Sequence, residues 1–121
     1  MTQKKTLVLG ASENPNRYSY LAIRKLLSRG HEVVAIGNRK GEVGGVAIQT
    51  GQELTEEIDT VTLYLNPTNQ KPYYDMLLSL KPRRVIFNPG TENYELDHLL
   101  REQGTETMEA CTLVMLGSGQ Y

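Results

Sequence analysis

The stretch Thr6-Leu7-Val8-Leu9-Gly10-Ala11-Ser12 decides the fold of this chain. A short apolar run ends at a glycine, small and polar residues follow, and an amphipathic segment begins at residue 18. This order is typical of a buried strand that turns tightly into a helix. Such a turn points backbone N–H groups and the positive end of a helix at one spot, so the stretch predicts a binding site for a phosphate group.

Further apolar runs of strand length follow, and helical patterns separate them. The runs show little alternation of polar and apolar residues, which is typical of parallel strands covered on both faces. The expected strands are residues 6–9, 32–36, 60–65, 84–87 and 105–108, with a short edge strand at 46–48. The expected helices are residues 18–29, 69–80 and 94–103, and residues 109–116 form a short closing helix or, alternatively, an extra strand. The order predicts a doubly wound α/β fold, with a mainly parallel Rossmann-like sheet of five or six strands and helices on both faces.

Composition narrows the classes of function. The 121 residues carry 13 Lys and Arg against 14 Asp and Glu, a net charge of −1. We expect one domain over residues 1–116 and a loose tail over 117–121. Because Lys and Arg residues are neither in excess nor clustered, we do not expect nucleic acid to be the main partner. Because the sequence shows no secretory signal and no apolar run near the roughly 18 residues that span a bilayer, we expect a cytoplasmic protein without a membrane partner.

The loops that follow the expected strands are the candidate ligand site. In an open α/β sheet, ligands lie outside the carboxyl ends of the strands, and the loops at 10–17, 37–45, 66–68 and 88–91 gather there. In the first loop only Gly10 matches the glycine-rich dinucleotide fingerprint, so that signal is weak. Ser12 and Arg17 offer donors to a phosphate. The alternative is that Gly10 only makes the turn and Ser12 caps the helix.

The second loop, Gly37-Asn38-Arg39-Lys40, lacks the carboxylate with which NAD-binding folds hold the ribose diol. Its two cations suit an additional ribose phosphate, as in NADP or the 3′-phosphorylated ADP of coenzyme A. The alternative is a solvated basic turn.

The third and fourth loops, Asn66-Pro67-Thr68 and Asn88-Pro89-Gly90, repeat one pattern. Proline ends the strand and keeps the preceding asparagine extended, so we expect both asparagine amides to point across the crevice. The alternative is that both motifs only terminate strands.

Together these motifs resemble the stand-alone CoA-binding proteins, which are built like the CoA-binding domain of the succinyl-CoA synthetase α subunit. The resemblance covers residues 4–113. Its motifs are Val8-Leu9-Gly10-Ala11-Ser12 with Pro15 and Arg17, Gly30-His31-Glu32-Val33-Val34-Ala35-Ile36, Gly44-Gly45, Ile58-Asp59-Thr60-Val61, Asn88-Pro89-Gly90 with Glu92-Asn93, and Cys111. It implies a Rossmann-like fold and a CoA site, and it implies no reaction.

We therefore expect a protein that binds coenzyme A or an acyl-CoA through its Gly-Ala-Ser phosphate loop, without a catalytic or metal-binding residue. The alternative is an NADP-binding redox protein or sensor that uses the same crevice. Partners beyond the small molecule are expected to be a second copy of the chain or an acyl-transfer enzyme. The candidate contact residues are Gly10, Ala11, Ser12, Asn14, Arg17, Tyr18, Asn38, Arg39, Lys40, Asn66, Pro67, Thr68, Asn88, Pro89, Gly90 and Cys111.

Overall fold

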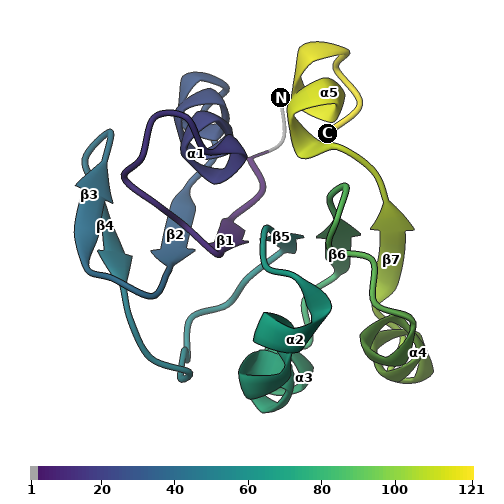
Figure 1. Ribbon diagram of the computed structural model, residues 1–121. Coiled ribbons are helices and arrows are strands. Elements are labelled where there is room, and N and C mark those ends of the chain that lie inside the picture. The colour runs from purple at the N-terminus through teal and green to yellow at the C-terminus, as the bar shows by residue number, and fades with distance from the viewer. Residues whose placement is uncertain (1–2) are drawn as a thin grey trace.

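The computed structural model describes residues 3–121 and contains one seven-stranded sheet (Figure 1). The first two residues of the expected domain lie outside the described residues. The strands are β1 (Thr6–Leu9), β2 (Val33–Ile36), β3 (Gly41–Val43), β4 (Val46–Gln49), β5 (Thr60–Leu63), β6 (Arg84–Phe87) and β7 (Glu106–Glu109). Their order across the sheet is β3-β4-β2-β1-β5-β6-β7, and every pair except β3–β4 is parallel. The prediction of a mainly parallel Rossmann-like sheet is confirmed.

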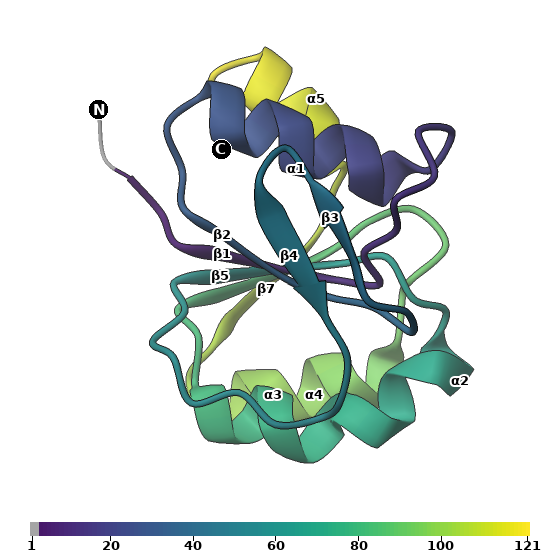
Figure 2. The ribbon, with the colours of Figure 1, turned by 90° about the vertical axis from the view of Figure 1, so that its left-hand side faces the viewer.

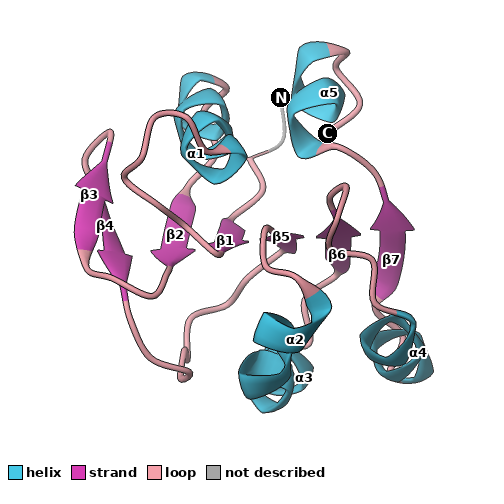
Figure 3. Ribbon diagram, in the orientation of Figure 1, coloured by secondary structure: helices cyan, strands magenta, loops and turns pink. Residues whose placement is uncertain are grey.

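The strand count is higher than the predicted five or six because part of the second loop forms a hairpin. β3 pairs antiparallel with β4, so that Val43 lies opposite Val46 at the edge of the sheet (Figure 3). The two residues between them, Gly44 and Gly45, have φ of 58° and 88°. Two successive positive φ angles are what a tight type I′ hairpin turn requires, and glycine adopts them without strain.

The helices cover both faces of the sheet. They are α1 (Tyr18–Ser28), α2 (Pro67–Gln70), the 3₁₀ turn η1 (Lys71–Tyr73), α3 (Tyr74–Leu80), α4 (Tyr94–Glu102) and α5 (Thr112–Gly117). Figure 2 shows α1 and α5 on one face and α2, α3 and α4 on the other. Within residues 3–121, no helix is long and apolar enough to cross a membrane.

The helix expected at 69–80 begins earlier and is interrupted. Pro67 starts α2, where its missing N–H costs no hydrogen bond, and the Asn66 side chain caps that helix. Pro72 lies in η1, because proline removes an N–H from the helical ladder and crowds the preceding turn. The closing helix expected at 109–116 is present as α5 and starts three residues later, at Thr112.

Successive strand residues pack on opposite faces of the sheet. Leu7 and Leu9 belong to the core beneath α3 and α4, whereas Val8 between them belongs to the core beneath α1 and α5. All four residues of β1, β2, β5 and β6 are buried. Because both faces are covered, every position of these strands is buried, and the polar residues among them are Thr6, Thr60, Thr62 and Arg84.

The expectation of a loose tail at 117–121 is wrong for its last residue. The Tyr121 hydroxyl is hydrogen-bonded to the Thr6 hydroxyl, and its backbone oxygen accepts from Lys4 Nζ at 2.7 Å. The ring lies 4.5 Å from the guanidinium carbon of the buried Arg84 and packs edge-on against His31. The glycines and polar residues before Tyr121 gave no sign of these contacts, which depend on residues far away in the sequence.

Candidate functional site

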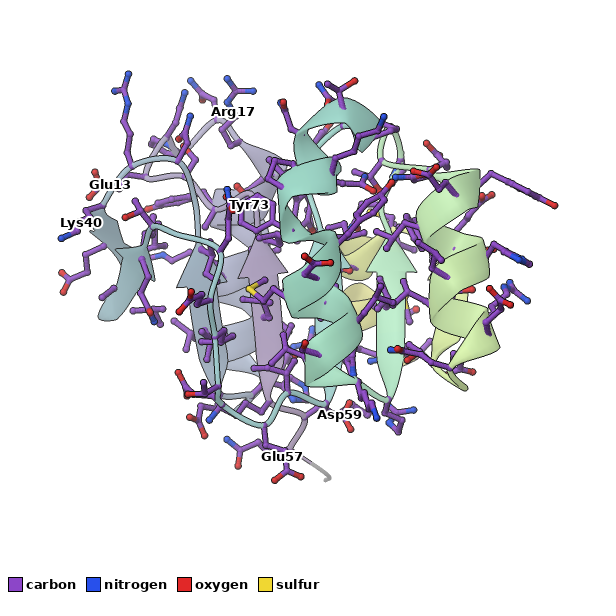
Figure 4. The ribbon with its side chains drawn as sticks, turned by 90° about the horizontal axis from the view of Figure 1, so that it is seen from below. Glu13, Arg17, Lys40, Glu57, Asp59 and Tyr73 are labelled. Carbon is purple, nitrogen blue, oxygen red and sulfur yellow. The ribbon has the colours of Figure 1, made fainter. Side chains whose placement is uncertain are left out.

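The loops at the carboxyl ends of the strands enclose an open pocket of about 630 Å³. It lies where the strand order reverses, between β1 and β5, which is the usual ligand position in an open α/β sheet. Figure 4 shows Arg17 and Tyr73 toward the carboxyl ends of the strands, and Glu57 and Asp59 toward their amino ends. The predicted contact residues that line the pocket are Gly10, Ala11, Ser12, Arg17, Tyr18, Asn38, Asn66, Pro89 and Gly90.

Two glycines allow the first loop to lie tightly against its neighbours. Gly10 has φ of 97°, and a Cβ added there would lie 3.0 Å from the carbonyl carbon of Tyr64 after β5. A Cβ on Gly37, after β2, would lie only 2.3 Å from the carbonyl oxygen of Ala11. The pocket floor is therefore backbone packed against backbone, and neither position has room for a larger residue.

The backbone donors at the first loop differ from those expected. The N–H groups of Gly10 and Ala11 both donate to the Ile36 carbonyl oxygen, at 2.9 and 3.0 Å. They hold the loop to β2, so the expectation that they would hold a phosphate is wrong for these two groups. The Ser12 hydroxyl accepts from the Asn14 N–H at 3.0 Å, and its own hydrogen is left to donate elsewhere.

The start of α1 supplies donors in their place. Its N-cap, Arg17, makes no side-chain capping bond, and the first helical residues, Tyr18 and Ser19, line the pocket. N–H groups in the first turn of a helix have no acceptor within the helix, so those of Tyr18 and Ser19 are available to a ligand. Arg17 is the one charged side chain among the pocket-lining residues that the structure describes. Arg17 therefore places a positive charge beside the start of α1.

Arg39 and Lys40 are exposed and do not line the pocket, whereas Asn38 just before them does. The first loop holds this turn in place, because Glu13 Oε2 accepts the Glu42 N–H at 2.9 Å. Figure 4 shows Glu13 and Lys40 at the same corner of the molecule. No sequence pattern predicts this contact, since the two loops lie far apart along the chain.

The two X-Asn-Pro motifs have different roles. Asn66 lines the pocket while its side chain caps α2, with Oδ1 accepting the Asn69 N–H at 2.8 Å. Asn88 is buried; its Nδ2 donates to Thr62 Oγ1 at 2.7 Å and to the Leu63 oxygen at 2.9 Å. Its Oδ1 accepts the Thr112 N–H at 2.8 Å. The expectation that Asn88 points across the crevice is wrong, because its amide joins β5 and β6 to the start of α5.

The remaining predicted contacts do not line the pocket. Asn14 shapes the first loop by accepting the Asn16 N–H, and Pro67 and Thr68 belong to the exposed start of α2. Cys111 is half-buried in the N-cap position of α5. That these four residues contact a ligand remains a prediction.

Sequence reasoning missed half of the pocket lining. The missed residues are Ser19, Gly37, Gln52, Tyr64, Leu65, Asn69, Pro72, Tyr73 and Thr91. The sequence predicts a strand over residues 60–65, but β5 ends at Leu63 and leaves Tyr64 and Leu65 on the pocket wall. Gln52 had a usable signal, because β4 runs parallel to β2 and the residues after it must reach the same edge of the sheet.

Tyr64 is the pocket residue with the most perturbed acidity. Burial raises its pKa to about 12. By geometry, its hydroxyl is buried without a hydrogen-bond partner among the described residues. It therefore stays protonated at neutral pH and can act as a donor but not as a general base.

Comparisons with known proteins give one family. A family model described as a CoA binding domain matches residues 4–117. A crystal structure described only as that of an uncharacterized protein is 54% identical, with 100% of each chain covered and a TM-score of 0.96. A conserved hypothetical protein from Pyrococcus furiosus is 27% identical, with 93% of this chain and 98% of that chain covered and a TM-score of 0.76. A hypothetical protein from Pyrococcus horikoshii OT3 is 23% identical, with 96% and 83% covered and a TM-score of 0.86. No curated protein matches the sequence.

Proposed function

The chain belongs to the CoA binding domain family, and on that premise we propose that its open pocket binds coenzyme A or an acyl-CoA without catalysing a reaction. The observation that carries the proposal is the uncapped N-terminus of α1, which faces the pocket beside Arg17. The diphosphate of CoA lies there in this proposal. It accepts from the Tyr18 and Ser19 N–H groups and from the Ser12 hydroxyl, and the guanidinium of Arg17 offsets part of its charge.

The 3′-phosphate is assigned to the basic turn after β2. Asn38 lines the pocket, so a ribose beside it brings a 3′-phosphate toward the exposed side chains of Arg39 and Lys40. Neither cation forms an ion pair with another residue in the described part of the chain. A phosphate would therefore not have to displace a carboxylate.

The pantetheine arm is assigned to the wall formed after β5 and β6. Leu65, Pro72 and Tyr73 present apolar surface there, and the lining on this side carries no charged side chain. This suits the uncharged arm of CoA. It also supports a binding role without catalysis, because Tyr64 stays protonated and neither Cys111 nor a histidine lines the described pocket.

Titration calorimetry with CoA, acetyl-CoA, dephospho-CoA, NADPH and NADH tests the proposal. We expect CoA and acetyl-CoA to bind, and Arg17→Ala to weaken both. Arg101→Ala removes the same charge from an exposed position on α4 and serves as the control. Binding of NADPH in preference to CoA would replace the proposal with the NADP-binding alternative, and binding of none of the five would remove it.

A second copy of the chain or an acyl-transfer enzyme stays a predicted partner. Light scattering of the purified protein, and capture of a purified acyl-transfer enzyme with and without CoA, test the two possibilities separately. A monomer that captures no such enzyme would contradict both.

A further inference from the structure

A buried glutamine joins the two loops that form one wall of the pocket. Gln70, the last residue of α2, is 0% exposed. Its Nε2 donates to the Leu65 carbonyl oxygen and to the Thr91 carbonyl oxygen, each at 2.8 Å. Leu65 follows β5 and Thr91 follows β6, and both line the pocket. We propose that Gln70 is a positioning residue that fixes these two loops in the geometry that binds the ligand.

The amide group is well suited to this role. A primary amide has two N–H donors and one carbonyl acceptor, and Gln70 uses all three functions. Its Oε1 accepts from Asn93 Nδ2 at 2.8 Å, which fixes the orientation of the amide and therefore the direction of both donors. A carboxylate of the same shape has no donor, and an apolar side chain would leave two buried carbonyl oxygens without a partner.

The network continues to the next helix. Asn93 Oδ1 caps α4 through the Leu96 N–H, and Asn93 Nδ2 also donates to the Tyr74 hydroxyl at 2.8 Å. Gln70 thus joins the loops to the N-terminus of α4 and to α3. Because α3 and α4 pack against the sheet, these hydrogen bonds hold the two loops in a position that the short loop sequences alone do not determine.

The bonds also change what the wall presents to a ligand. The Leu65 and Thr91 carbonyl oxygens each accept one hydrogen bond from the buried Gln70 amide, so part of the acceptor capacity of each is already used within the protein. This wall is the one assigned to the uncharged pantetheine arm, so the inference rests on the CoA-binding function proposed above.

The test compares Gln70→Met with Thr105→Val. Methionine keeps the length of the side chain but removes its hydrogen bonds. Thr105 is also buried, and its hydroxyl donates to the Pro82 carbonyl oxygen at 3.0 Å, away from the pocket at the amino-terminal edge of the sheet. Both variants lose stability. We expect Gln70→Met to weaken CoA binding about tenfold through the lost ordering of two loops, and Thr105→Val to leave it within twofold.

Hydrogen exchange in the absence of ligand, compared between the two variants, separates a local loosening of the two loops from a general loss of stability. The amides of Asn69 and Thr91 are protected by bonds to Asn66 and Asn88 within the two loops. Gln70→Met should speed exchange of both amides relative to Thr105→Val. Unchanged exchange in Gln70→Met, or equal losses of CoA affinity in the two variants, would overturn the inference. If the unaltered protein binds no CoA, the proposed function fails, and the exchange rates still decide whether Gln70 positions the loops.

Discussion

The carbonyl oxygen of Ala11 occupies the space where a side chain at position 37 would begin, because a Cβ on Gly37 would lie 2.3 Å from it. No real Cβ tolerates such a contact, so Gly37→Ala must push the first loop away from β2. The N–H groups of Gly10 and Ala11 would then lose their shared acceptor, the Ile36 carbonyl oxygen.

We therefore expect Gly37→Ala to destabilise the protein by about 1–3 kcal/mol and to weaken CoA binding. Gly45→Ala is a useful comparison, since a Cβ there meets nothing within 4 Å although φ is +88°. It should cost stability through backbone strain but leave CoA affinity unchanged. Urea denaturation and calorimetry measure the two effects, and full CoA affinity in Gly37→Ala would contradict the packing described here.

Arg39→Ala tests the assignment of the 3′-phosphate. If Arg39 contacts that group, the change should weaken CoA by roughly five- to tenfold, a range typical of one exposed charge-assisted hydrogen bond, and should leave dephospho-CoA unaffected. The ratio of the two dissociation constants is the quantity to measure. Equal losses for both ligands would remove the role given to Arg39.

Asn88→Ala tests the structural role of Asn88 in joining β5 and β6 to α5. The change leaves the Leu63 oxygen and the Thr112 N–H buried without their partner. We expect a loss of about 2–4 kcal/mol in the free energy of unfolding. Asn66→Ala removes an exposed helix cap and should cost about 1 kcal/mol. Similar losses in the two variants would show that Asn88 has no special structural role.

His31 should make stability depend on pH. Burial, aided by the nearby Lys4 and Arg84, lowers the pKa of His31 below its ordinary value of 6.5. Its Nδ1 accepts the Lys4 N–H at 2.9 Å, a bond that protonation would break. The unfolded chain therefore binds the proton more readily than the folded protein. Stability should be complete above pH 6.5 and fall as pH drops below that value.

Unfolding midpoints measured between pH 5 and 7.5 check this expectation. His31→Gln should flatten the dependence, while His98→Gln, which changes an exposed histidine on α4, should not. A slope that His31→Gln leaves unchanged would contradict the assignment.

The order of strands and helices could be predicted because it depends on local patterns. Apolar runs at residues 6–9 and 84–87 match β1 and β6, and the glycine after residue 9 marks the turn into the pocket. Contacts between distant segments could not be predicted in this way. The side-chain bonds of Asn88, the bond between Tyr121 and Thr6 and the bonds of Gln70 with Thr91 and Asn93 each join residues more than 20 positions apart. A polar residue that completes such a contact has no periodic signature in the sequence.

The central claim is that the start of α1 holds the diphosphate of CoA. Titration of ¹⁵N-labelled protein with CoA tests it most directly, with the amide resonances of Ser12, Tyr18 and Ser19 as the readout. We predict large, saturable shifts at these amides and none at Lys81, which lies by the amino-terminal edge of the sheet. Saturable binding that leaves Tyr18 and Ser19 unshifted would contradict the account.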